Sequence, residues 1–344
     1  MNYRLQPFAG VMLAVALMGF KPDSAWACAT CGCTLSADGA MGYAVGSGWR
    51  LDFEYDYINQ DELRSGTRAA TPSEVVDNPS NPALGGGEIE NSTLNRYFTI
   101  GIGYSPSVNW NLDLRVPYIE RNHTSFGQQS TPYAAAETAP DQLSGARVSG
   151  LGDARFIVSY QGLLPENNLG LQWGIKLPTG SYGTKAKFNS GAEVGTPLDD
   201  SLQAGSGSTD LIVGAYFYRP ISLNFDAFVN GQIQVAVISA QRQPGNDFRP
   251  GNSSTISFGV RYEADPRFVP QLQVNLLRRD ADQGALADTA DTAGTVAYLS
   301  PGATMRIQGR MHFYGFVQLP VYSNLSGYQL FPHWTASMGL SYAF

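Results

Sequence analysis

Apolar and polar residues alternate strictly at the C-terminal end of the chain. From Trp334 to Phe344, the even positions are apolar or aromatic, and the odd positions carry small and mostly polar side chains. Successive side chains of a β-strand point to opposite faces, so this segment predicts a strand with one apolar and one polar face. A closing strand that ends on an aromatic residue is typical of outer-membrane barrels.

The same two-residue period recurs along the chain. In WRLDFEYDY, the apolar row from Trp49 to Tyr57 alternates with four charged residues. Four charges on one strand face are costly in lipid but suit a wet lumen. The pattern predicts about twelve strands, at 49–57, 94–104, 110–118, 152–161, 169–177, 209–218, 223–235, 254–263, 268–279, 294–306, 309–322 and 334–344.

The links between these segments alternate in length. Short links fall at 105–109, 162–168, 219–222, 264–267 and around 307–309, and long polar links at 60–92, 120–148, 180–208, 238–253, 280–293 and 323–331. Short periplasmic turns and long extracellular loops alternate in this way in bacterial barrels. The sequence therefore predicts an all-β fold, a transmembrane antiparallel β-barrel of about 12 strands, in the cell outer membrane with both termini periplasmic.

The N-terminal residues have the pattern of a secretory signal. Arg4 precedes an apolar run from Phe8 to Phe20, which is too short to span a bilayer, and Ala25-Trp26-Ala27 matches a small-residue cleavage site. We predict a signal peptide at 1–27, a periplasmic Cys-rich tether at 28–48 and the barrel at 49–344. The formal net charge of −7 argues against a nucleic-acid partner.

All three cysteines lie within CATCGC, as Cys28, Cys31 and Cys33. Three thiolates suit Cu(I), or zinc with a further ligand, so a soft metal ion is the cofactor that the sequence raises. Oxidation to a disulfide with one thiol left over and lipidation of Cys28 are the alternatives. If the barrel spans the membrane with both termini in the periplasm, we expect the cluster to dock at the periplasmic mouth near Asp52 and Glu54 and not to trail in solvent.

Charged residues of the inward-facing rows are the candidate pore lining. Rings of opposite charge set ion selectivity in channels, and in a barrel of intermediate width the same residues can pair and fill the lumen. The predicted pore-lining residues are Arg50, Asp52, Glu54, Asp56, Asp113, Arg115, Asp153, Arg155, Lys176, Asp210, Asp226 and Arg261.

Aromatic residues and prolines on the inward rows leave two further questions. Phe228, Tyr314 and Phe316 either contact an aromatic solute or fill space. Three prolines near strand ends indicate either a gap in the barrel wall or the tolerance of strand ends for proline; they are Pro117, Pro178 and Pro320.

Several stretches together resemble the outer-membrane family named for the MetA pathway of phenol degradation, a transporter-like group. They are CATCGC, RLDFEYDYINQDELRSG, SGLGDARF, GIKLPTG, GSGSTDL, RPGNS, YLSPG, YGFVQLPVY and GYQLFPHWTASMGLSYAF. The resemblance covers nearly the whole chain after the signal peptide. It implies uptake of aromatic compounds without fixing a substrate, and it transfers no catalytic residue.

We therefore expect an outer-membrane channel or transporter for small solutes, aromatic or hydrophobic compounds among them. The alternative is a metal-handling adaptor that uses the cysteine cluster for copper or zinc. An enzyme is not expected, because His312 falls on the inward row and no G-x-S-x-G motif occurs. The expected partners are outer-membrane lipid, the barrel-assembly machinery and a small-molecule solute.

Overall fold

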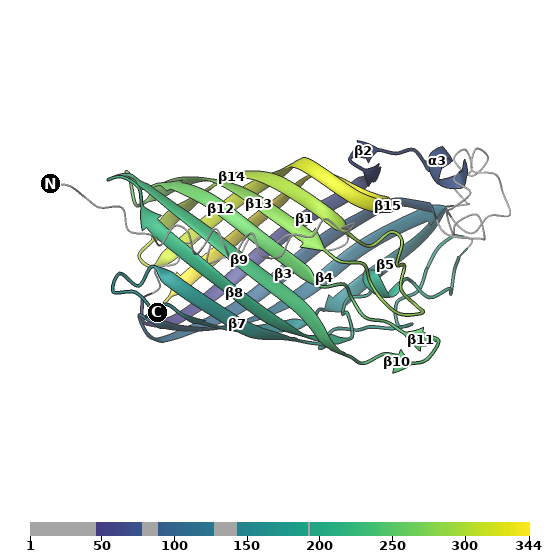
Figure 1. Ribbon diagram of the computed structural model, residues 1–344, viewed down its shortest axis with the longest axis horizontal. Helices are drawn as coiled ribbons and strands as arrows, with labels where there is room; N and C mark the ends of the chain where they lie inside the picture. The colour runs from purple at the N-terminus through teal and green to yellow at the C-terminus, as the bar shows by residue number, and fades with distance from the viewer. Residues whose placement is uncertain (1–45, 78–88, 127–142, 192) are drawn as a thin grey trace, which may run out of the picture.

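The computed structural model describes residues 46–77, 89–126, 143–191 and 193–344 and is all-β. The predicted signal peptide and most of the predicted tether lie outside these ranges. Within them, no helix is long and apolar enough to cross a membrane. The wall strands (Figure 1) are β1 (Gly48–Gly66), β3 (Ile89–Ser107), β4 (Trp110–Phe126), β5 (Leu143–Leu151), β6 (Ala154–Tyr160), β7 (Leu169–Leu177), β8 (Ser208–Pro220), β9 (Phe225–Ser239), β12 (Ser253–Tyr262), β13 (Phe268–Arg279), β14 (Gly294–Gln308) and β15 (Met311–Ala343).

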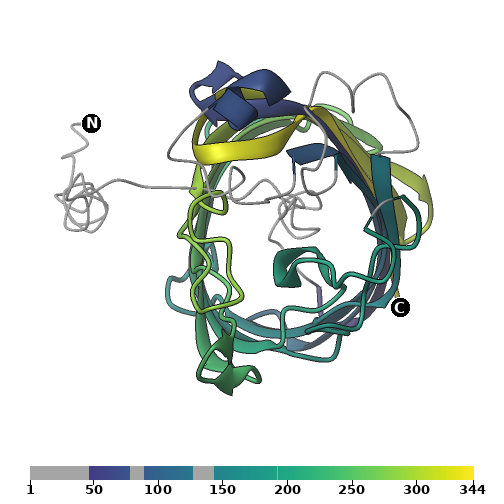
Figure 2. The same ribbon diagram turned by 90° about the vertical axis from the view of Figure 1, so that its right-hand side faces the viewer.

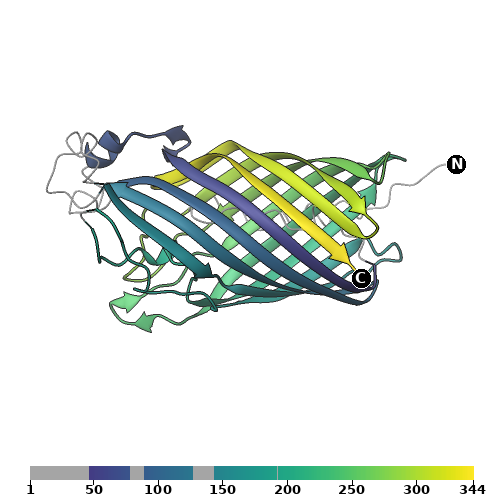
Figure 3. The same ribbon diagram turned by 180° about the vertical axis from the view of Figure 1, so that it is seen from behind.

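The wall is a closed antiparallel sheet. Successive crossings of the wall pair with each other, and β1 pairs with β15 to complete the ring. At the seam, the backbone N–H of Trp49 donates to the carbonyl oxygen of Phe344 at 3.0 Å, and the N–H of Phe344 donates back at 2.9 Å. Figure 3 shows β1 between the C-terminal part of β15 and β3. Both ends of the barrel sequence therefore lie at the end of the barrel that has the short turns.

The long strand β15 crosses the wall twice. Eleven strands form the ring along the described chain, and all eleven pairings are antiparallel. β5 pairs with the loop-side part of β4 and β6 with its turn-side part, so β5 and β6 make one crossing, and β2 (Arg68–Ala69) pairs only with β1. A ring with an odd number of members cannot be antiparallel throughout unless one member reverses. β15 does so, because residues up to Leu325 pair with β14 and residues from Leu325 onward pair with β1. Gly327, with φ of 42°, lies at the reversal, and the ring has the twelve crossings that the sequence predicts.

Aromatic side chains on the outer face mark two levels of the wall. At the turn end, the rings of Trp49 and Tyr104 lie 4.5 Å apart, and at the loop end, those of Tyr57 and Trp334 lie 5.4 Å apart. The two levels are separated along β1 by about 26 Å at ~3.3 Å per residue. Because barrel strands are tilted by about 35–45°, this length corresponds to a height of about 20 Å along the barrel axis. Two aromatic girdles that flank an apolar band are the mark of a membrane-spanning barrel.

Several strands extend past their predicted ends on the loop side. The links predicted at 60–92 and 120–148 are wrong at their edges, because β1 continues to Gly66 and β4 to Phe126. Beyond the girdle the outer face meets water and no longer requires apolar residues, so the alternation weakens while the backbone pairing continues. The short helix α3 (Pro72–Asp77) and β2 follow β1 there, and the hairpin β10 (Arg242–Gln243) and β11 (Asn246–Asp247) follows β9.

Large aromatic side chains on the inner face pack against glycines of the neighbouring crossing of the wall. A Cβ built on Gly339 would lie 2.3 Å from Cζ of Tyr314, and one on Gly259 would lie 2.3 Å from Cε1 of Phe228. The same relation holds for two further pairs, Phe316 with Gly302 and Tyr216 with Gly170. The bare glycine face lets each ring pack against the wall, so the inner surface has no ring projecting from these positions.

The reversal of β15 is held by an acidic loop. Oδ1 of Asp291 accepts a hydrogen bond from the backbone N–H of Tyr328 at 2.9 Å, directly after Gly327. The N–H of Asp291 donates to Asp288 at 3.0 Å. Burial and the negative charge of Asp288 raise the pKa of the Asp291 carboxyl to about 7.

Replacing Gly339 by Ala will destabilise the barrel. The new methyl group displaces the Tyr314 ring, and overpacking of this kind costs about 1–3 kcal/mol. The matched control is Gly315→Ala, where the nearest atom would be 3.7 Å away. Urea titration of the refolded protein, followed by tryptophan fluorescence, measures the difference, and equal midpoints for the two variants would contradict the packing described.

The β15 reversal will loosen as the pH rises. The pKa of Asp291 is raised to about 7 from the 3.8 of a free aspartate, so the folded reversal favours the protonated carboxyl group. The stabilisation that this group gives to the folded state is therefore complete below about pH 4 and is lost as the pH passes 7. Asp291→Asn keeps the acceptor oxygen and cannot ionise. Hydrogen exchange at the Tyr328 amide, corrected for the intrinsic rate, should match wild type at pH 5 and be slower than wild type at pH 8.5.

Candidate functional site

The lumen holds a cavity of about 380 Å³ that the inner faces of the wall strands and two loop segments, 200–206 and 248–251, enclose. Seven predicted pore-lining residues border it, namely Glu54, Asp113, Arg115, Asp153, Arg155, Lys176 and Asp210. Arg50, Asp52 and Asp56 lie in the inner wall of β1 outside this border, and Asp226 pairs in register with Arg261 near the turns. The structure thus groups most of the predicted charges at one level of the barrel.

Charged side chains of β1 and β4 meet across a bare stretch of β3. Arg50 contacts Asp52 at 2.8 Å and Asp113 at 3.2 Å. Arg115 contacts Asp113 at 2.6 Å and Glu54 at 3.7 Å. Gly101 of β3 lies between the two strands, and a Cβ there would be 3.2 Å from Asp52. The missing side chain lets ion pairs form between strands that are not neighbours.

The acidic side of this ladder also contacts β15. The hydroxyl group of Tyr314 donates to Oε2 of Glu54 at 2.5 Å, and that of Ser337 donates to Oδ1 of Asp56 at 2.5 Å. Both carboxylates are buried. Neither carboxylate has an arginine of its own, and hydrogen bonds from neutral hydroxyl groups stabilise both of them.

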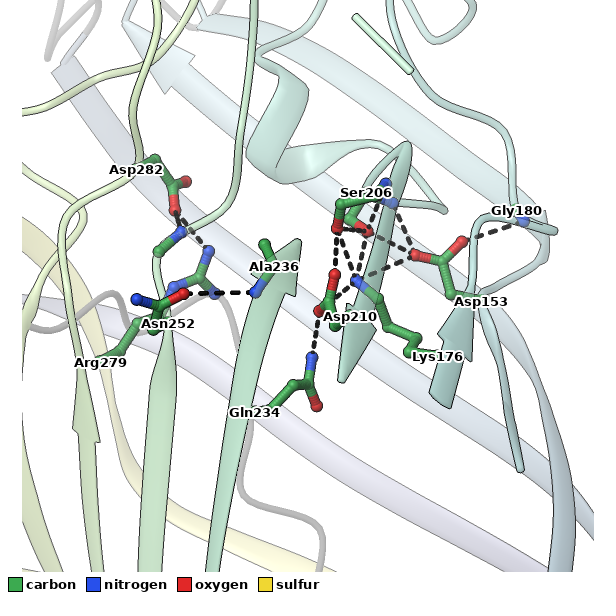
Figure 4. A network of polar contacts seen from close by, with 12 residues as sticks. Asp153, Lys176, Gly180, Ser206, Asp210, Gln234, Ala236, Asn252, Arg279 and Asp282 are labelled. Atoms are coloured by element: carbon green, nitrogen blue, oxygen red, sulfur yellow. Dashed lines mark hydrogen bonds and ion pairs between the residues drawn. The ribbon is translucent and has the colours of Figure 1, made fainter. Parts of the chain in front are cut away.

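Lys176 is the centre of a second polar cluster, drawn in Figure 4. Its ammonium group lies 2.9 Å from Asp210 and 3.5 Å from Asp153, and it donates to Ser208 at 3.0 Å and to Ser206. Asp153 also accepts from the N–H of Ser206 at 2.9 Å and from the N–H of Gly180 at 3.1 Å. One buried lysine thus joins the wall to the two ends of a loop.

That loop, residues 178–207 and here called the inner loop, folds into the barrel. Its short 3₁₀ helix, Asp200–Leu202, lies inside the ring in the view along the barrel (Figure 2). Arg121 of β4 donates to the carbonyl oxygens of Ser201 at 3.3 Å and Gln203 at 3.2 Å, and to Asn95 at 2.6 Å. A buried guanidinium thereby fixes the end of the loop that leads into β8 against β4, a strand that is separated from β7 in the wall by β6 alone.

Apolar residues hold the body of the inner loop to the wall. Phe188, Leu198, Leu202 and Ala204 of the loop form a buried cluster with Ala146 and Val148 of β5. The sequence predicts this segment as a long polar link and does not indicate that it turns inward. Its apolar residues, spaced through a polar stretch, were the available signal.

The wall bulges where β5 passes into β6. The pairs Tyr118 with Leu151 and Arg115 with Arg155 enclose two residues of β4 and three of the partner strand. The carbonyl oxygen of Pro117 accepts from the N–H of Gly152 at 2.8 Å, so the wall is hydrogen-bonded at this proline. The extra residue turns the Asp153 side chain toward Lys176, which is a known use of bulges.

The three aromatic residues that the sequence places on the inner face are not among the residues that line the cavity, whose aromatic lining in the described part of the chain is Tyr97 and Phe248. Phe228, Tyr314 and Phe316 are buried against glycines, so space filling is the interpretation that fits. Amides and hydroxyls make up the wall of the cavity that faces Arg155, and they are Asn230, Gln232, Gln234, Thr255, Ser257 and Asn275. This neutral polar wall was not predicted from the sequence.

The cysteine cluster lies outside the described residues, so its metal, disulfide and lipid interpretations stay predictions. In the ranges that the structure describes, no group of three or more His, Cys, Asp or Glu side chains is arranged to hold a metal ion.

Comparison with known proteins yields the fold. No family model and no curated protein matches the sequence. An outer membrane channel from Pseudomonas putida F1 superposes with a TM-score of 0.61 at 12% identity, over 90% of this chain and all of that one. Two further structures are less similar. The translocator domain of the autotransporter NalP from Neisseria meningitidis superposes with a TM-score of 0.48 at 9% identity, over 87% of this chain and 90% of that one. The toluene transporter TbuX of Ralstonia pickettii superposes with a TM-score of 0.43 at 10% identity, over 87% of this chain and 90% of that one. The chain has the fold of an outer-membrane β-barrel.

Replacing Lys176 by Met will release the inner loop. The substitution leaves Asp153 and Asp210 as buried carboxylates without a cation, and breaking a buried pair costs about 3–5 kcal/mol. Proteinase K should then cut within residues 178–207 of the folded barrel faster than in wild type. Lys185→Met, in the same loop but with its ammonium group 5.7 Å from the Tyr182 ring, is the control. Equal cleavage of both variants would refute the role of Lys176.

Proposed function

We propose that the protein is a passive outer-membrane channel for small solutes. The observation that carries the proposal is a polar cavity inside a closed ring of strands whose outer face has an apolar band between two aromatic girdles. A wall of this kind excludes polar solutes from the lipid and leaves the lumen as their route. The fold shared with the channel from Pseudomonas putida F1 is consistent with this role.

The inner loop defines the size of the solute in this proposal. It narrows the lumen from inside, and the cavity of about 380 Å³ between the loop and the wall suits a molecule of a few to about twenty non-hydrogen atoms. The resemblance of the sequence to a family of aromatic-compound transporters supports a small aromatic solute. No observation on the described residues favours the metal-handling alternative.

The orientation in the membrane follows from the loop lengths. The turns at the end that holds Trp49 and Phe344 are short, and the links at the other end are long and include the inner loop. Short turns on the periplasmic side are the rule in bacterial barrels. We place the two ends of the barrel sequence in the periplasm and the inner loop at the extracellular side.

Narrowing the cavity will reduce transport. Thr255 of β12 lines the cavity, and the adjacent Ile256 lies on the lipid face of the same strand. Thr255→Trp should lower single-channel conductance in planar bilayers, and the rate of small-sugar entry into liposomes, by severalfold, because the indole occupies space in the lumen. Ile256→Trp should leave both rates at the wild-type level. A wild-type barrel that is folded and passes neither ions nor sugars would refute the channel proposal.

A further inference from the structure

Three cations stand side by side on the inner wall at the level of the cavity. Arg115 of β4 is in register with Arg155 of β6, and Arg155 is in register with Lys176 of β7. Directly opposed residues on one face of an antiparallel pair have Cβ atoms about 4.5–5.5 Å apart. Like charges at this spacing destabilise one another unless each has a counter-charge.

The two outer cations of the row have their counter-charges. Arg115 contacts Asp113 and Glu54, and Lys176 contacts Asp210 and Asp153. These carboxylates also accept hydrogen bonds from other groups, namely Arg50 for Asp113, Tyr314 for Glu54, Ser206 and Gly180 for Asp153, and Ser208 and Gln234 for Asp210. The nearest acids are therefore already bound by an outer cation and by further hydrogen-bond donors.

The middle cation, Arg155, has no such partner. Its side chain is exposed inside the barrel and lines the cavity. Among the described residues it makes no ion pair and no hydrogen bond, although Asp153 is only two positions away along the chain, just before β6 begins. A guanidinium between two other cations, facing a confined volume, attracts an anion. Its planar donors match a carboxylate in a bidentate arrangement.

Apolar groups border the same part of the cavity. Ile157 follows Arg155 on the inner face of β6, and Pro117 follows Arg115 on the inner face of β4. The neutral amides and hydroxyls of β9 and β12 line the facing wall, and they add hydrogen-bonding groups without a competing negative charge. A cation beside apolar side chains suits a ligand with a charged end and a hydrocarbon body.

We propose that Arg155 binds the carboxylate of small organic acids that pass through the lumen. The hydrocarbon part of the acid packs against Ile157 and Pro117, and the carboxylate accepts two hydrogen bonds from the guanidinium. The inference rests on the proposed channel function and specifies its substrate class. It also gives Arg155 a different role from those of Arg115 and Lys176, which hold the wall and the inner loop together.

The test compares a carboxylate with a neutral molecule of the same shape. Purified protein in liposomes takes up benzoate or benzyl alcohol, each corrected for leakage through protein-free liposomes. Arg155→Gln should slow protein-dependent benzoate uptake roughly fivefold and leave benzyl alcohol unchanged, as expected for the loss of one charge contact in a wet cavity. Arg155→Lys should keep part of the benzoate preference. Because the Arg155 side chain holds nothing in place, these variants should fold like wild type.

The matched control is Arg261→Gln. Arg261 is also on the inner wall, but it contacts Glu263 at 3.0 Å and lies outside the lining of the cavity, so its replacement should leave benzoate uptake unchanged. If wild type passes ions but takes up benzoate no faster than Arg155→Gln does, the carboxylate site is refuted and the channel stands. If the folded wild-type barrel passes no ion and neither probe, the channel proposal itself fails.

Discussion

The structure depends on the pairing of every backbone amide in a wall that lies in lipid. Without water, an unpaired N–H or C=O group in the hydrocarbon region costs several kcal/mol, so the sheet has to close on itself. Closure is made by β1 and β15, and it requires an even number of crossings if all neighbours are antiparallel. β15 meets this requirement because it crosses the wall twice. The enclosed lumen, its polar lining and the inner loop all follow from a wall without edges.

Inside the closed wall, the positions of glycines decide which side chains meet. Gly101 has no side chain on the inner face of β3, so Arg115 of β4 can contact a carboxylate of β1 as well as one of its own strand. Gly339 and Gly259 leave space for the rings of Tyr314 and Phe228, which pack against the wall and do not project into the lumen. A lumen of this width is therefore partly filled by residues that lie along its wall, and the space that remains is shaped by the inner loop.

Residue alternation predicts the strands because lipid on one side and water on the other impose a period of two. It assigns Asp113, Arg115, Arg155 and Lys176 to the inner face for the same reason, but it cannot say which of them pair. Pairing depends on register, on the bulge at Gly152 and on bare glycines between strands. The inward fold of the inner loop also escaped prediction, since it depends on contacts of Arg121 and Lys176 with residues distant in sequence. Strand ends beyond the girdle were missed because lipid imposes no pattern there.

The seam between Trp49 and Phe344 has a consequence for the order in which the protein is made. The first wall strand finds its final partner only in the last residues of the chain, so the sequence separation of this contact is nearly the whole length of the barrel. Such contacts carry the largest loop-closure entropy and form late. Until the chain is complete, the growing sheet has two open edges, which invite pairing with other chains. Assembly of this barrel therefore needs both edges kept apart from other strands until β15 is available to pair with β1.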